Sequence, residues 1–275
     1  MSGSLALALV PLTLGRTEGW PWWMIALLAA APPVFALAVR YESRLARRGG
    51  HPVLDLTLFR ARSFSAGLVV NAGVFAYFGS IMLGLTLFLQ LGLGLSALDA
   101  GLSFAPLGVG FAATSLLAQP LIARYGARVI STGLAIAGAS VGGLLLDVHL
   151  SGAATDPARL APLFFAIGIG NGCVVPALIG ASLSDVPPAK AGAAAGALQT
   201  TQQFAIAGGV AVLSEIFFAT LGPGLGVHDY LHAMQYVLAF DLALIAACLA
   251  SSWLLPRPRP VRVEAPEAEA AAESV

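Results

Sequence analysis

Two acidic residues, Glu215 and Asp241, lie well inside long apolar segments of the sequence. An ionised side chain at the centre of a bilayer costs at least about 2.5–3.5 kcal/mol, so such acids usually face a cavity or a partner group. A carboxyl group in such a place can take up and release a proton, and both residues are therefore candidates for proton coupling. Thr201 and Gly208 share a helix face with Glu215. The alternative for Glu215 is a carboxyl that reaches the outer interface or hydrogen-bonds to another helix.

Amide side chains form a second group of polar residues within the apolar segments. Amides in a membrane can line a substrate path or bond helices together, and packing is the favoured role for most of them. Asn71 and Asn171 are the better candidates for a substrate cavity, and Gln199 and Gln203 are further candidates.

Other reactive residue types do not form a recognisable site. His228 and His232 are spaced to bind a metal if the segment is helical, but no third ligand is evident and a solvated outer loop is the favoured interpretation. Cys173 and Cys248 lie inside apolar runs, which argues against a disulfide framework or a thiolate metal site. No arrangement of nucleophile, base and orienting group appears, and the glycines at 168–172 lack the spacing of a dinucleotide loop. We therefore expect no enzyme activity, no cofactor and no metal.

The composition identifies the environment of these residues. Of the 275 residues, 58% are hydrophobic and 10% are charged, and the mean hydropathy is +0.85. A soluble domain has about 25% charged residues, so this composition predicts an integral membrane protein in contact with the lipid bilayer. The formal net charge of zero provides no basic field to attract nucleic acid.

Long apolar runs predict an all-α, polytopic membrane helix bundle. They are continuously apolar rather than alternating, which favours helices over barrel strands. Pro106, Pro162 and Pro176 fall inside such runs, where kinks are expected. The spacings Gly138/Gly142 and Gly192/Gly196 allow close helix contact, although such spacings are common in polytopic proteins. The seven predicted spans are Trp20–Val39, Phe64–Leu91, Leu98–Ile122, Val129–Val148, Leu160–Leu183, Ala191–Leu221 and Ala233–Leu255.

The ends of the chain differ from these spans. The run Ser4–Leu14 is too short to cross the hydrocarbon core. A signal peptide is one interpretation, but no positive residue precedes the run, and we favour the tail of a helix whose beginning is missing. Residues 256–275 mix prolines, arginines and glutamates and predict a disordered tail.

Basic residues predict the orientation. If the first full span runs from outside to inside, 12 of the 14 basic residues fall in cytoplasmic segments and only Arg16 and Arg159 fall outside. The positive-inside rule therefore predicts a cytoplasmic C-terminus. The 12 are Arg40, Arg44, Arg47, Arg48, Arg60, Arg62, Arg124, Arg128, Lys190, Arg257, Arg259 and Arg262.

Five stretches carry a family resemblance in the right order. They are GRTEGWPWW (15–23), HPVLDLTLFRARSF (51–64), FLQLGLGLSALDAGLSFAPLGVG (88–110), QPLIARYGARVI (119–130) and VPPAKAGAAAGALQTTQQ (186–203). Together they resemble the C-terminal half of a fourteen-helix drug:proton antiporter of the major facilitator superfamily. The resemblance covers the chain up to about Pro256.

The resemblance implies a domain plan. Residues 1–16 would be a partial helix, the remnant of a linker helix, and 20–63 a linker helix with an Arg-rich cytoplasmic loop. Residues 64–255 would be a six-helix transmembrane bundle built of two three-helix repeats, followed by the cytoplasmic tail at 256–275.

The resemblance also ranks the polar candidates. The ninth and twelfth helices of the family line its cavity, which favours Asn71 and Asn171. The thirteenth flanks the cavity, which keeps Glu215 plausible, and the fourteenth lies outside, which disfavours Asp241.

One loop resembles the gating loop of the superfamily. Arg124, Gly126 and Arg128 are its candidate residues here. Ala123 stands where the family has an acid, so Arg124 lacks the partner for the family's ion pair.

These implications lead to a functional hypothesis. We expect the C-terminal part of a proton-coupled exporter of drugs or small metabolites, with an apolar or cationic substrate, in the cell (plasma) membrane. Because alternating access needs two bundles, the chain is expected not to transport without the missing N-terminal bundle. One alternative is a half-transporter that works with a separate N-terminal half or as a dimer. Another is a non-transporting membrane scaffold or binding protein.

Overall fold

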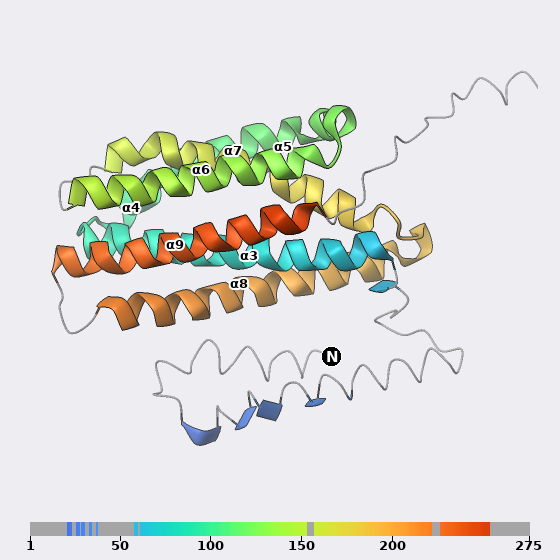
Figure 1. Cartoon of the computed structure of the whole chain (residues 1–275), viewed down its shortest axis with the longest axis horizontal. Helices are drawn as coiled ribbons and strands as arrows, with labels where there is room; N and C mark the ends of the chain where they lie inside the picture. The colour runs from blue at the N-terminus through green and yellow to red at the C-terminus, as the bar shows by residue number, and fades with distance from the viewer. Residues whose placement is uncertain are drawn as a thin grey trace, which may run out of the picture.

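Figure 1 shows the computed structural model of the chain, which is a bundle of long helices. It describes residues 58–59, 61–152, 157–221 and 226–253, with separate positions between 21 and 37. In the predicted span Trp20–Val39, the described positions after Pro21, such as Trp22 and Leu37, are helical. The predicted partial helix at 1–16, most of the linker region at 20–63, and the whole tail at 256–275 lie outside the described residues.

Six helical segments among the described residues are long and apolar enough to cross a membrane. They correspond to the last six predicted spans and confirm the all-α membrane bundle, because each contains an unbroken apolar stretch of sufficient length. The six are Arg62–Gly92, Ala97–Tyr125, Arg128–Ser151, Pro157–Leu183, Pro188–Leu221 and Val227–Ser252.

Several of these segments are divided into shorter elements. In chain order the elements are α3 (Arg62–Leu87), the π-helical turn η2 (Phe88–Gly92), α4 (Ala97–Ser103), α5 (Ala105–Tyr125), α6 (Arg128–Ser151), α7 (Pro157–Leu183), the 3-10 turn η4 (Pro188–Lys190), α8 (Ala191–Leu221) and α9 (Val227–Ser252).

The prolines act differently from one helix to the next. Pro162 and Pro176 lie inside the continuous helix α7, as expected of prolines within a span. Pro106 instead lies in the first turn of α5, directly after the break at Phe104 that separates α4 from α5. Proline has no N–H for a helical hydrogen bond and is tolerated at a helix start, so the predicted single run Leu98–Ile122 becomes two helices.

The first helix of each half of the bundle packs mainly on the later helices of the other half. α3 packs on α8 and α9, whereas α7 packs on α5 and α6. α3 also contacts α7, and α6 contacts α9. Figure 1 shows α5, α6 and α7 as one group and α3, α8 and α9 as the other. If α3, α5 and α6 are matched to α7, α8 and α9, the α5–α7 contact corresponds to α8–α3 and the α6–α7 contact to α9–α3, as expected for two related three-helix units. The match is incomplete, because α8 packs on α9 more closely than α5 packs on α6.

Glycines allow the closest helix contacts. A Cβ atom at Gly209 of α8 would overlap the backbone carbonyl of Ala76 on α3, and a Cβ at Gly168 of α7 would overlap the carbonyl of Leu107 on α5. The α3–α8 and α5–α7 interfaces correspond to each other when the two three-helix units are matched. The glycines with predicted close spacing do not supply them: a Cβ at Gly142, Gly192 or Gly196 would meet no atom within 4 Å, and one at Gly138 would meet Ile245 on α9 at 3.2 Å.

Candidate functional site

Four polar side chains gather in the buried interior of the bundle. Tyr77 and Ser80 come from α3, Asn171 from α7 and Asp241 from α9. Tyr77 and Ser80 are three residues apart and therefore share a face of α3. All four are at most 2% exposed, and Asp241 is completely buried. We call these four residues the polar cluster.

The polar cluster holds polar atoms without a formed hydrogen bond. The hydroxyl of Tyr77 lies near the side chains of Asn171 and Asp241, and Ser80 lies near the Asp241 carboxyl. These approaches do not have hydrogen-bond geometry, so the Tyr77 and Ser80 hydroxyls, the Asn171 Nδ2 and both Asp241 oxygens lack partners. Each buried unpaired polar group costs about 1–3 kcal/mol, so their concentration at one place makes the polar cluster a candidate site.

Asn71 lies in a separate hydrogen-bonded contact. Gln202 Nε2 on α8 donates to Asn71 Oδ1 over 3.3 Å, and Asn71 Nδ2 donates to the backbone carbonyl of Leu198 over 3.5 Å. Asn71 is fully buried and Gln202 is 6% exposed. In this conformation Asn71 thus ties α3 to α8. The predicted cavity residues Gln199 and Gln203 are exposed on α8, on either side of Gln202 in sequence.

Glu215 and Asp241 have opposite environments. Glu215 is exposed on α8. Gly208, on the same face, is half-buried and has open space where a Cβ atom would lie. Asp241 belongs to α9, which the family resemblance places outside the cavity, but its side chain is directed into the bundle interior. The structure therefore brings Asp241 and Asn171 together and separates both from Glu215.

The predicted gating loop is a tight turn between α5 and α6. Gly126 has φ +61° and ψ −139°, and its N–H donates to the carbonyl of Ile122 over 2.8 Å. This backbone conformation is strained for any residue with a Cβ atom. Arg124 and Arg128 are exposed on either side, and the Arg124 guanidinium lies 5.4 Å from the ring centroid of Tyr125.

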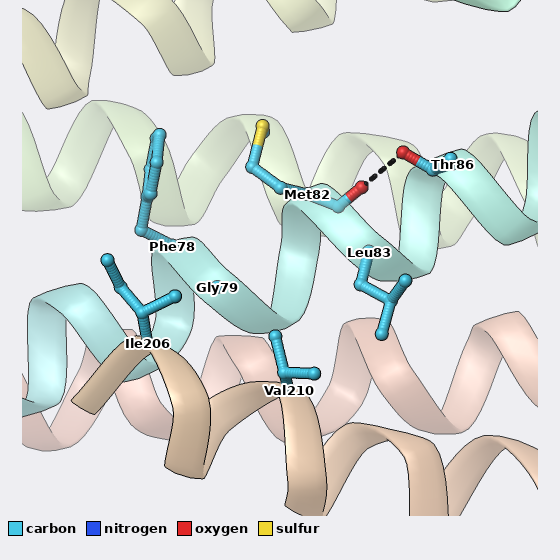
Figure 2. A pocket seen from close by; sticks show the side chains of 7 residues that line it. All are labelled: Phe78, Gly79, Met82, Leu83, Thr86, Ile206 and Val210. Atoms are coloured by element: carbon cyan, nitrogen blue, oxygen red, sulfur yellow. Dashed lines mark hydrogen bonds between the residues drawn. The ribbon is translucent and has the colours of Figure 1, made fainter. Parts of the chain in front are cut away.

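An apolar groove of about 320 Å³ opens between α3 and α8. Figure 2 shows Phe78 and Met82 on α3 and Ile206 and Val210 on α8 around it. Thr86 also lines the groove, but its hydroxyl donates to the Met82 carbonyl over 2.7 Å. The groove therefore presents apolar surface, as small-molecule sites commonly do. Sequence reasoning did not identify it, because apolar residues occur throughout every span.

A second hollow, of about 450 Å³, lies between the end of α6 and the start of α9. It is lined by His149 together with His228, Asp229 and His232. The N–H of Gly226 donates to the Asp229 carboxylate over 3.1 Å, and this hydrogen bond caps the N-terminus of α9. The helix therefore begins at Val227 and not at the predicted Ala233. The predicted outer loop at the two histidines is therefore wrong, since both lie in the helix. Within the described ranges, no three His, Cys, Asp or Glu side chains are placed to hold a metal ion.

The fold and these sites define a polytopic helical membrane protein with an apolar groove and a buried polar centre. Comparison with known proteins identifies the family: residues 1–210 match the Major Facilitator Superfamily, and the chain belongs to it. This is a family of membrane transport proteins, which supports the expectation from the sequence that the chain is not an enzyme.

Several relatives have names that refer to transport or resistance. The chain is 33% identical over 223 residues to the probable actinorhodin transporter of Streptomyces coelicolor, covering 81% of this chain and 39% of that protein. It is 33% identical over 241 residues to a tetracycline resistance determinant of Streptomyces rimosus, covering 86% and 67% respectively. It is 32% identical over 204 residues to the drug efflux pump JefA of Mycobacterium tuberculosis, covering 74% and 38%. The chain thus spans about two fifths of the length of the first and third relatives.

Proposed function

We propose that this chain supplies the C-terminal bundle of a proton-coupled exporter of drugs or small metabolites. The carrying observation is the apolar groove between α3 and α8, in a chain whose relatives include a drug efflux pump and a resistance determinant. An apolar wall of this kind favours apolar or cationic organic molecules as substrates. The distribution of basic residues supports a plasma-membrane orientation with the C-terminus in the cytoplasm.

A second, N-terminal bundle would complete the transporter. In their most apolar 18-residue stretches, the segments containing α5 and α8 have 17% and 22% of residues buried, against 39% or more in the other four segments. Their remaining surface is available to lipid or to another bundle. Alternating access needs two bundles that move about a site between them, so we propose that the bundle described here works with a second one.

The exposed polar residues of α8 fit this arrangement. Gln199 and Gln203 are exposed and would face the substrate path if the second bundle docks on α8. Glu215 on the same helix would then be a candidate for proton coupling beside Asp241. Asn171 would act from the cavity-lining helix α7, and Arg124, Gly126 and Arg128 would form a turn at the cytoplasmic side.

The proposal is tested with the chain reconstituted in lipid vesicles. Binding of a cationic fluorescent dye to the purified chain is expected, because the groove is present in this bundle. Efflux driven by a pH gradient is not expected from the chain alone. The absence of dye binding would contradict the exporter proposal and favour a non-transporting scaffold. Robust efflux by the chain alone would contradict the need for an N-terminal bundle and favour a half-transporter that works as a dimer.

A further inference from the structure

The Asp241 carboxyl lies in an unusual place for an acid. It is completely buried and its two oxygens have no hydrogen-bond partner. Its polar neighbours lie on two other helices. Ser80 and Tyr77 belong to α3, and Asn171, which lies beside Tyr77, belongs to α7. Each of these neighbours carries an uncharged polar group.

No described basic side chain is positioned to balance a charge on Asp241. The hydroxyls of Ser131 and Ser252 are 3.3 Å apart, which places the end of α9 beside the start of α6 and its exposed Arg128. Asp241 lies eleven residues before Ser252, or about 16 Å along the helix axis. Arg62 is exposed at the first residue of α3, about 22 Å along that helix from Tyr77.

The other titratable groups of the surrounding helices are also distant or uncharged. On α9 itself, His232 is nine residues before Asp241, about 13 Å along the axis, and Cys248 is buried two turns after it. On α6, Asp147 and His149 lie near the outer end, beside the hollow at the start of α9. On α8, Glu215 is exposed. Tyr77 is therefore the titratable group that faces Asp241 from a packed helix.

An ionised Asp241 would be shielded from bulk solvent and would have no counter-ion among the described side chains. Burying a charge without a counter-ion is far more costly than burying a neutral carboxyl group. A protonated carboxyl gains one O–H donor, which the hydroxyl oxygens of Tyr77 and Ser80 and the amide oxygen of Asn171 can accept. Small side-chain adjustments would then satisfy polar atoms that are unpaired in the present arrangement.

We propose that the polar cluster is a proton-binding site in which Asp241 holds one proton while α9 is packed against α3. The proton comes from water, forms the O–H bond of the carboxyl, and returns to water when the cluster becomes hydrated. The cluster links α9 to α3 and α7, so proton release weakens the packing among these three helices. The inference deepens the proposed proton coupling by naming its site. Its test reads the carboxyl directly, so it can fail independently of transport.

Infrared difference spectroscopy on the purified chain in lipid tests the proposal. At neutral pH, the wild-type chain is expected to show the C=O stretch of a buried, protonated carboxylic acid, and Asp241→Asn is expected to lose it. Glu215→Gln is the matched control and is expected to retain the band, because Glu215 is exposed. Tyr77→Phe keeps the acid but removes a hydrogen-bond partner, so it should shift the frequency of the band without abolishing it.

A second measurement covers the case in which Asp241→Asn does not fold. A hydrophobic carbodiimide reacts with protonated carboxyl groups in apolar surroundings, and mass spectrometry of the wild-type chain should find the adduct at Asp241. The inference is overturned if neutral-pH spectra lack the protonated band and no adduct forms. It is also overturned if sodium ions abolish the band and the adduct, since the cluster would then bind a metal cation instead of a proton.

Discussion

Two adjacent glycines on α8 provide a sharp test of the packing between α3 and α8. A Cβ atom at Gly209 would overlap the Ala76 backbone carbonyl of α3, whereas a Cβ at Gly208 would meet no atom within 4 Å. Gly209→Ala and Gly208→Ala make the same chemical change on the same helix. Their comparison therefore isolates the contact between the helices.

The expected difference in stability follows from this geometry. Both variants gain helix propensity, about 0.8–1.0 kcal/mol on a scale measured in water, and this gain cancels in the comparison. Only Gly209→Ala must force α3 and α8 apart, because the obstructing atoms belong to backbone and cannot rotate away. Overpacking of this kind costs about 1–3 kcal/mol. At about 2–4 °C per kcal/mol, Gly209→Ala should melt about 2–12 °C below Gly208→Ala.

The chain contains its own reporter for this measurement. Cys173 and Cys248 are both buried free thiols, so a thiol-reactive fluorescent dye should label them only as the bundle unfolds. Heating all variants in the same detergent at the same rate keeps the comparison valid if unfolding is irreversible. A Gly209→Ala variant that melts at the same temperature as Gly208→Ala, or higher, would refute the close contact between α8 and α3.

Three further predictions use single changes. Gln202→Ala should lower the free energy of unfolding by about 1–3 kcal/mol, because it leaves the buried Asn71 carbonyl without its donor. Gln203→Ala, at the exposed neighbour, should change the melting temperature little. Equal melting temperatures of the two variants would contradict the buried contact. Gly126→Ala should lower the free energy of unfolding by about 1–3 kcal/mol, because the backbone conformation at this position strains any residue with a Cβ. An unchanged melting temperature would contradict the positive φ at residue 126. Val210→Trp should fill the groove and weaken dye binding to the purified chain, with Val212→Trp, at an exposed position on the same helix, as the control; equal dye affinity in the two variants would place the dye elsewhere.

Local sequence patterns did not predict two helix boundaries, the break between α4 and α5 and the start of α9. Hydropathy joined Leu98–Ile122 into one run because it does not register the backbone hydrogen bonds that Pro106 cannot make. It also began the last span at Ala233, because the polar His228 and His232 lower the local average. The cap formed by Gly226 and Asp229 is a hydrogen-bonding feature, and it extends α9 through both histidines.

The polar cluster was only partly predictable. Asn171 and Asp241 are conspicuous as polar residues in apolar spans, and both were candidates. Tyr77 and Ser80 are ordinary members of a membrane helix and provided no such signal. The association of Asp241 with α3 and α7 depends on how α9 is rotated about its axis, which sequence spacing within α9 does not specify.

The sequence by itself determined that this protein is a polytopic membrane helix bundle, where its six described spans lie, and that it resembles a transporter family. These properties follow from the length of apolar runs and from local motifs. Only the tertiary structure decided which of two neighbouring residues faces the interior: Gly209 rather than Gly208, and Gln202 rather than Gln203. The physical reason is that these spans are apolar on every side, so a helix carries little record of which face its neighbours will cover.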